Sequence, residues 1–226
     1  DARKEIADWI GTEKQRLNEK MAKECDTIVA GLYEYLAIYE PLFPKKTEFI
    51  PFPIVCDDDT PTIEFHKDGE PIKIFIGINK SRSAYKGTDI MLKAAKEVES
   101  KYPDKLKLTV VESVPFDEYR KMMMSCDAIV DQLYSYTPSM NPLEAMSHGL
   151  ICIGGGEPEN YEVLNETELR PIVNVEPTFK SVYSQIENMV LHPENISTMQ
   201  RQSIEYIRKH HDYIKVAKQY EKLYMK

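Results

Sequence analysis

Cysteines, glycines and long apolar runs are all scarce in this sequence. The four cysteines (Cys25, Cys56, Cys126 and Cys152) are too far apart for a zinc-binding pair or a redox-active Cys-X-X-Cys motif. No apolar stretch approaches the roughly 20 residues of a membrane-spanning helix. We also find no signal peptide, internal repeat or low-complexity segment. We therefore expect no disulfide framework, and a reducing cytosol fits the cysteines best.

An excess of positive charge is also lacking. The 226 residues include 37 acidic and 29 basic side chains, and the net charge of -8 argues against a general nucleic-acid-binding protein. This balance still allows a local basic pocket for a small phosphate ligand. With 42% apolar and 29% charged residues, collagen, mucin and wholly disordered chains are excluded. Because the chain starts at Asp1 inside a helical pattern, we expect a piece of a longer protein.

Strand and helix patterns alternate along the second part of the chain. This alternation predicts an α/β fold, with a parallel sheet covered by helices on both faces. Expected strands are 106–111, 127–131, 150–153 and 171–174, and expected helices are 88–101, 115–124, 141–148 and 158–165. Two or three further helices are expected within 178–224.

The first part of the chain carries a separate helix and strand segment. Its patterns predict, in chain order, helix 2–24, strand 26–30, helix 32–40 and strand 47–50. The proline-rich and acidic stretch 51–61 is the best candidate for a linker. After it, we predict a hairpin in which 62–65 pairs with 71–77 around an Asp68-Gly69 turn.

The loop from Gly77 to Thr88 is the first candidate for ligand binding. In open parallel sheets, ligands bind at the carboxyl ends of the strands. This loop leaves a buried strand and enters a helix, whose first N–H groups would point at an anion. Arg82 and Lys86 add positive charge there and could clamp a diphosphate; the alternative is a solvated basic loop. The glycines match neither a Walker loop nor a G-X-G-X-X-G motif.

A second candidate loop runs from Asp131 to Gly149 and contains a short helix with Pro142 near its first turn. Glu144 lies just inside this helix. Its carboxylate is either stabilised by the helix dipole or accepts hydrogen bonds from sugar hydroxyls, and spacing alone leaves both interpretations open. We expect His148, near the end of the same helix, to be a helix-end residue and not a catalytic one.

A third candidate is the glycine run Gly154–Gly156. Three successive glycines allow either the close approach of a ligand or a sharp turn between strand and helix. His210 and His211 are adjacent and so lack the i, i+3 or i+4 spacing of a metal pair, and we expect them to lie on a solvated helix face. Asp57–Asp59 could attract a cation, but a run of acidic residues in a linker is expected to be solvated. We therefore expect no metal site.

Four segments, in this order, carry a family resemblance: "IKIFIGINKSRSAYKGTDIMLKAA", "CDAIVDQ", "PLEAMSHGLICIGGG" and "HPENISTMQRQSIEYI". They resemble the donor-binding domain of family 4 glycosyltransferases, which have the two-domain GT-B architecture, and are most similar to bacterial surface-polysaccharide transferases. "KECDTIVAGLYEYL" and "TEFIPFPI" resemble the end of the family's acceptor-side domain. The resemblance implies two parts: 1–65, the end of the acceptor-side domain and the linker, and 66–226, a Rossmann-like nucleotide-sugar-binding domain.

What the resemblance implies about activity is specific. The reaction would be the retaining transfer of a hexose from a UDP- or GDP-linked sugar to a glycan or lipid-linked acceptor, with no metal or other cofactor. Arg82 and Lys86 would hold the diphosphate, and Glu144 would accept hydrogen bonds from the ribose. The donor-binding residues implied are Gly77, Arg82, Lys86, Tyr136, Ser139, Met140, Asn141 and Glu144.

One position departs from the family pattern. The family has two glutamates separated by seven residues, but Tyr136 stands where the first is expected, and a phenol cannot carry its negative charge. This departure keeps two alternatives open: a non-catalytic domain that binds a nucleotide or a partner protein, and a sugar-nucleotide epimerase of the same architecture. The expected location is the cytoplasm, with peripheral attachment to the inner face of the plasma membrane through residues outside this chain as a further expectation.

Overall fold

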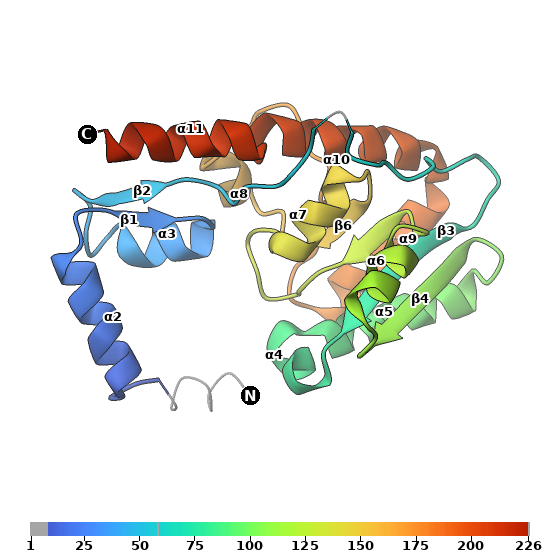
Figure 1. Ribbon diagram of the computed structural model, residues 1–226. Helices are drawn as coiled ribbons and strands as arrows, with labels where there is room; N and C mark the ends of the chain where they lie inside the picture. The colour runs from blue at the N-terminus through green and yellow to red at the C-terminus, as the bar shows by residue number, and fades with distance from the viewer. Residues whose placement is uncertain (1–8, 58, 226) are drawn as a thin grey trace.

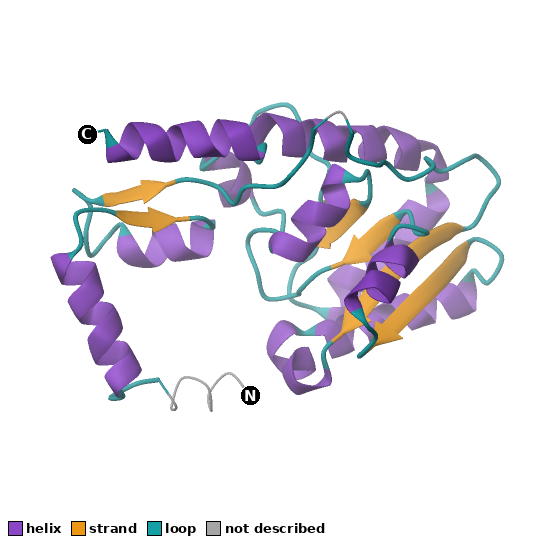
Figure 2. Ribbon diagram, in the orientation of Figure 1, coloured by secondary structure: helices purple, strands orange, loops and turns teal. Residues whose placement is uncertain are grey.

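The computed structural model describes residues 9–57 and 59–225 and contains two parallel sheets. The larger sheet has five strands in the order β4-β3-β5-β6-β7, and each neighbouring pair is parallel (Figures 1 and 2). This confirms the predicted α/β fold. The strands are β3 (Ile72–Ile78), β4 (Leu106–Glu112), β5 (Ala128–Val130), β6 (Ile151–Gly154) and β7 (Val173–Asn174).

Helices cover both faces of this sheet. Alternate residues of β3 point to opposite sides: Ile74 and Ile76 pack with α5 and α9, whereas Phe75 packs on the face covered by α6 and α7. Since both faces are buried, the strands β5 and β6 are apolar throughout, and β3 is apolar except for Lys73 near its start. From α5 onward, the helices of the chain are α5 (Thr88–Lys101), α6 (Phe116–Met123), α7 (Met140–Ser147), α8 (Pro158–Glu162), α9 (Phe179–Leu191), α10 (Ile196–His210) and α11 (Tyr213–Tyr224), and the last of these extends beyond the large sheet (Figure 1).

The N-terminal segment forms a separate two-stranded parallel sheet, from β1 (Ile28–Ala30) and β2 (Thr47–Phe49), with α3 (Tyr33–Tyr39) between them. The prediction of one helix over 2–24 is confirmed for Glu13–Glu24 but is wrong for residues 9–12, which form a turn. The helix α2 covers only Glu13–Glu24, because Gly11 has a positive φ of 77° and the Thr12 side chain caps the helix at the Gln15 N–H. Residues 1–8 of that prediction lie outside the described residues.

The predicted hairpin is also wrong. The turn at 67–70 is present, with the Glu70 N–H donating to the Lys67 carbonyl, but residues 62–65 form no strand. Both edges of β3 are already occupied, by β4 on one side and β5 on the other. The Ile63 N–H instead donates to the carbonyl of His148 after α7.

The order in which strands are added to the large sheet changes side at β3, although all the strands are parallel. From β3 the chain moves outward to β4, and then crosses back to β5 on the other side of β3. The loops that follow β3 and β5 therefore diverge around one crevice at the carboxyl edge. Such a switch point is where ligands bind in open parallel sheets. The segment after β3 (79–87) and the segment after β5 (131–139) form the two sides of this switch point.

Candidate functional site

A cavity of about 280 Å³ lies at this switch point and is called the β3–β5 cavity below. Four of the predicted donor-binding residues line it: Gly77, Lys86, Ser139 and Asn141. They come from the end of β3, from the short helix that follows it and from the start of α7. The structure thus brings together residues that are up to 64 positions apart in the sequence, Gly77 and Asn141, as expected for segments at one edge of a parallel sheet.

Lys86 is positioned by two short turns. The Asn79 side chain accepts from the Ser81 N–H and starts a 3-10 turn, which leads into the one-turn helix α4 (Ser83–Lys86). Gly87 ends α4 with a φ of 70°, and a Cβ there would come within 2.6 Å of the Leu133 Cβ. The Lys86 carbonyl accepts a 2.7 Å hydrogen bond from the Leu133 N–H, so its backbone is fixed to the loop after β5.

Arg82, the second predicted cation, does not line the β3–β5 cavity. It is exposed on the 3-10 turn, and its guanidinium lies 5.7 Å from the ring centre of Tyr85. Lys86 is therefore the basic residue that the structure places on the cavity wall. A role of Arg82 in holding a diphosphate stays a prediction.

Asp131, at the end of β5, is a site residue that sequence reasoning missed. Its carboxylate is buried and accepts two hydrogen bonds from Ser139, from N–H at 3.0 Å and from Oγ at 2.7 Å. Burial raises the pKa of this carboxyl, while Ser139 and the nearby Lys86 favour its ionised form. Asp131 thereby fixes the start of α7 against the sheet. In the sequence, the one indication that Asp131 belongs to the site is its position directly after the apolar strand residues 128–130.

The N-terminus of α7 faces the same edge. Ser139 is its N-cap residue, but the side chain is turned to Asp131 and does not cap the helix. Met140 and Asn141 begin the helix, so their N–H groups have no acceptor within it, and Pro142 has no N–H. These two donors and the positive end of the helix dipole favour an anion, and Asn141 lines the cavity that Lys86 lines.

Tyr119 of α6 also lines the β3–β5 cavity, beside the start of α7. Its hydroxyl accepts a 2.8 Å hydrogen bond from the Asn141 side-chain amide. A Cβ at Gly77 would lie 2.7 Å from that hydroxyl, which explains why a residue without a side chain ends this part of β3. Sequence reasoning found Gly77 but missed Tyr119, because the tyrosine approaches from a helix whose orientation the sequence does not specify.

Glu144 lines a neighbouring cavity of about 670 Å³ between α6, α7 and the linker, together with Met140 and Asn141. Its carboxylate lies 3.8 Å from the Arg120 guanidinium, in an ion pair that is partly exposed. Because Asn141 lines both cavities, Glu144 lies beside the β3–β5 cavity and not in it. His148 forms the C-cap of α7, and its Nδ1 bonds to the Pro61 carbonyl, as expected of a helix-end residue.

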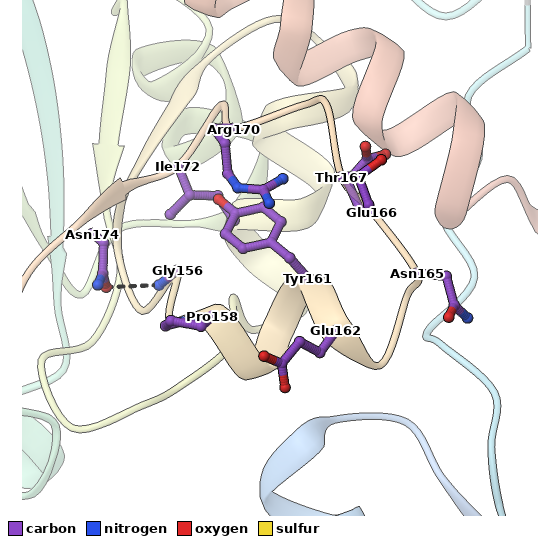
Figure 3. A pocket seen from close by; sticks show the side chains of 10 residues that line it. All are labelled: Gly156, Pro158, Tyr161, Glu162, Asn165, Glu166, Thr167, Arg170, Ile172 and Asn174. Atoms are coloured by element: carbon purple, nitrogen blue, oxygen red, sulfur yellow. Dashed lines mark hydrogen bonds between the residues drawn. The ribbon is translucent and has the colours of Figure 1, made fainter.

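A third cavity, of about 700 Å³, lies beside α8 (Figure 3). Arg170 stacks on the ring of Tyr161, with its guanidinium 4.1 Å from the ring centre. Glu166, on the same wall, is buried and bonds to His210 and Lys209, and these hydrogen bonds outweigh burial and lower the pKa of its carboxyl. None of the predicted donor-binding residues lines this cavity, but Gly156, from the glycine run that was the third candidate, does.

The backbone of the glycine run packs closely against the loop after β5. A Cβ at Gly155 would lie 2.1 Å from the Ser135 carbonyl oxygen, a contact between two backbones that no side-chain movement relieves. We expect Gly155→Ala to lower the free energy of unfolding by about 1–3 kcal/mol. Urea denaturation measures this, with Gly154→Ala as the control, since its nearest contact is 3.2 Å away. Equal losses in both variants would contradict the close approach.

Metal ligands are not grouped in the described part of the chain: no three His, Cys, Asp or Glu side chains there are placed to hold an ion. The expectation of a metal-independent site stays a prediction.

Comparison with known proteins gives structural matches only. No protein-family model and no curated protein sequence matches the chain. Among solved structures, a sucrose-phosphate synthase from Thermosynechococcus elongatus matches with a TM-score of 0.66 at 14% identity, over 96% of this chain and 63% of that one. TarM of S. aureus matches with a TM-score of 0.66 at 12% identity, over 94% of this chain and 46% of that one.

A third match is HepE of Anabaena, solved with UDP-glucose. Its TM-score is 0.67 at 12% identity, over 94% of this chain and 68% of that one. The chain thus spans about half to two thirds of these proteins. At such identities the likeness shows the fold alone: the five-stranded parallel sheet and its helices have the fold of one Rossmann-like half of the GT-B architecture.

Proposed function

We propose that the chain is the donor-binding part of a family 4 glycosyltransferase. It would take a UDP- or GDP-linked hexose and serve a transfer, with retention of configuration, to a glycan or lipid-linked acceptor in bacterial cell-envelope polysaccharide synthesis. The observation that carries the proposal is the placement of Lys86 and the N-terminus of α7 on one cavity at the sheet's switch point. Both are sources of positive potential beside an edge that binds nucleotides in this fold class.

The chemistry of transfer fits these groups. Breaking the bond between sugar and diphosphate builds negative charge on the leaving phosphate. A fixed ammonium at Lys86 and the N–H groups of Met140 and Asn141 would stabilise that charge without a metal ion. Glu144, beside the cavity, would accept hydrogen bonds from the ribose hydroxyls. Retention would follow if the acceptor attacks from the face that the leaving group departs.

Two observations support a nucleotide sugar as the ligand. HepE was solved with UDP-glucose, and the pneumococcal transferase GtfA, with a TM-score of 0.61, was solved with UDP and GlcNAc. UDP is therefore the first ligand to test. The acceptor would bind in the part of the enzyme that this chain does not span, since it covers only 46–68% of TarM, the synthase and HepE.

We place the enzyme in the cytoplasm, with peripheral attachment to the inner face of the plasma membrane as part of the proposal. Over residues 9–57 and 59–225, the structure has no helix that is both long and apolar enough to cross a bilayer. The lipid-linked acceptor proposed here would be presented at that membrane face.

A non-catalytic domain that binds a nucleotide or a partner is the second candidate. It is favoured by Tyr136, which is 46% exposed, lies beside Tyr33 with ring centres 5.4 Å apart and ring planes tilted by 49°, and lines none of the cavities described above. Transfer activity distinguishes the two candidates. In the longer enzyme, Tyr136→Glu would raise activity if the site is a working but altered one, and would leave a non-catalytic domain inactive.

Calorimetric titration with UDP, GDP and ADP tests the proposed function directly. We expect one nucleotide to bind without metal and with unchanged affinity after addition of Mg²⁺. Binding that appears only with Mg²⁺ would contradict the metal-free site. Failure of all three nucleotides to bind a folded protein would contradict donor binding itself.

A further inference from the structure

Glu34, in the first turn of α3, crosses from the N-terminal segment to the loop after β5. Its Oε1 accepts hydrogen bonds from the Ser135 hydroxyl at 2.6 Å, the Tyr136 N–H at 2.7 Å and the Thr137 N–H at 3.1 Å. Its Oε2 accepts from the Thr137 hydroxyl at 2.6 Å. One carboxylate is thus bound by four donors of residues 135–137, about 100 positions away in the sequence.

Residues 135–137 therefore form a receptor for a carboxylate. Two successive backbone N–H groups and two hydroxyls converge on one anion, which is the arrangement of an anion-binding nest. Although burial opposes ionisation, the hydrogen bonds from Ser135 and Thr137 keep the pKa of Glu34 below its usual value. The carboxylate is consequently charged at neutral pH, and its hydrogen bonds are of the stronger, charge-assisted kind.

The position of this loop connects it to the β3–β5 cavity. Residue 137 is two positions before Ser139, which Asp131 holds at the start of α7. On the other side the loop is pressed against Gly155, and the Tyr136 carbonyl accepts from the Glu157 N–H at 3.2 Å. Glu34 and Lys86 also line one cleft of about 330 Å³. Whatever orders residues 135–137 therefore orders the wall that carries the anion-binding start of α7.

We infer that Glu34 is a positioning residue, which holds the loop after β5 in the form that binds the donor diphosphate. This contact, called the Glu34 latch below, makes the shape of the donor site depend on the N-terminal segment. Both carboxylate oxygens of Glu34 accept hydrogen bonds from the loop, so its role is to position the loop and not to bind the diphosphate itself. The inference rests on the proposed function for its effect on nucleotide binding, but the latch itself is measurable without any nucleotide.

Hydrogen exchange measures the latch. In Glu34→Ala, the Tyr136 amide loses its acceptor and the Thr137 amide keeps only the long contact to Ser135 Oγ at 3.4 Å, so we expect both to exchange about tenfold faster or more. Glu34→Gln keeps one carbonyl oxygen and should give an intermediate rate. Sodium formate, compared with sodium chloride at equal ionic strength, should restore slow exchange in Glu34→Ala by filling the vacated receptor. A general loss of folding would not be reversed by formate.

Glu40→Ala is the matched control. It removes the same charge at the other end of the same helix, where Glu40 is exposed and, among the described residues, makes no side-chain hydrogen bond or ion pair. We expect normal exchange in this variant. Unchanged exchange at Tyr136 and Thr137 in Glu34→Ala would overturn the latch, whether or not a nucleotide binds.

Calorimetry with UDP then measures the consequence. We expect Glu34→Ala to bind UDP about tenfold more weakly than the unchanged protein and Glu40→Ala, with recovery in formate. Equal affinity in all three proteins would overturn the positioning role and leave the proposed function intact. Failure of the unchanged protein to bind UDP, GDP or ADP would overturn the proposed function and the positioning role with it, whereas the exchange rates would still decide the latch.

Discussion

Replacing Lys86 by alanine will weaken the binding of UDP by about 10- to 100-fold. The ammonium of Lys86 is the cation on the wall of the β3–β5 cavity, close enough to Asp131 to favour its ionised form. A charge-assisted hydrogen bond to a phosphate contributes about 1.5–3 kcal/mol, which corresponds to this change in affinity. Calorimetric titration of the variant with UDP measures the loss.

Lys80→Ala is the control for this prediction. Lys80 lies on the same loop, but it is highly exposed and pairs with Glu112 at 2.8 Å outside the cavity. Removing the same charge there should change UDP affinity less than about twofold, because exposed ion pairs and distant charges are screened. Similar losses in Lys80→Ala and Lys86→Ala would show that UDP senses only the general charge of the loop, and would contradict a built phosphate site.

The second large effect concerns stability and pH. His211 is buried at the junction of α10 and α11, where its Nδ1 donates to the Phe52 carbonyl and its own carbonyl accepts from the Ile54 N–H. Burial, and secondarily the neighbouring His210, lower the pKa of His211 to about 4, although the Phe52 hydrogen bond opposes this. An unfolded histidine has a pKa near 6.5. Between these values the unfolded chain binds a proton that the folded chain does not.

The free energy of unfolding should consequently fall by about 3 kcal/mol from pH 7 to pH 4 through this residue alone. The sign follows from linkage: stability rises with pH wherever the unfolded state holds more protons. His211→Asn, which keeps a donor for the Phe52 carbonyl, should be less stable at pH 7 but show a shallower pH dependence. Urea denaturation at several pH values tests this. Parallel pH curves for the two proteins would contradict a neutral, buried His211.

The elements that the sequence predicts best are those with a local cause. The helix expected over 88–101 is observed as α5 with the same bounds. Its apolar and charged faces lie within the helix itself, and Gly87 directly precedes it, so all of these signals are local in the sequence. The order of strands and helices after residue 66 is likewise confirmed. Prediction failed where the pairing of a segment depends on strands distant in the sequence. Residues 62–65 have the pattern of a hairpin strand, but β4 and β5 occupy both edges of β3, so no edge is free to pair with them.

The same limit applies to the site. Lys86, Ser139 and Asn141 were predicted, and the structure brings them to one cavity with Gly77, whereas Arg82 and Glu144 lie outside its wall. Asp131 carried only a weak signal, as a carboxylate directly after an apolar strand. Glu34 carried none. The four groups that donate hydrogen bonds to Glu34 belong to residues 135–137, about 100 positions away, so no periodicity or local motif could relate Glu34 to that loop.

The central claim is that a nucleoside diphosphate binds at the switch point between β3 and β5. Two-dimensional NMR spectra of isotope-labelled protein, recorded during a titration with UDP, test it most directly. The account predicts that the shifted amides lie in the loop 78–88, at Asp131 and in 139–144. Shifts confined to the wall of the cavity beside α8, over 156–174, or no shifts at saturating concentrations of either UDP or GDP, would contradict it.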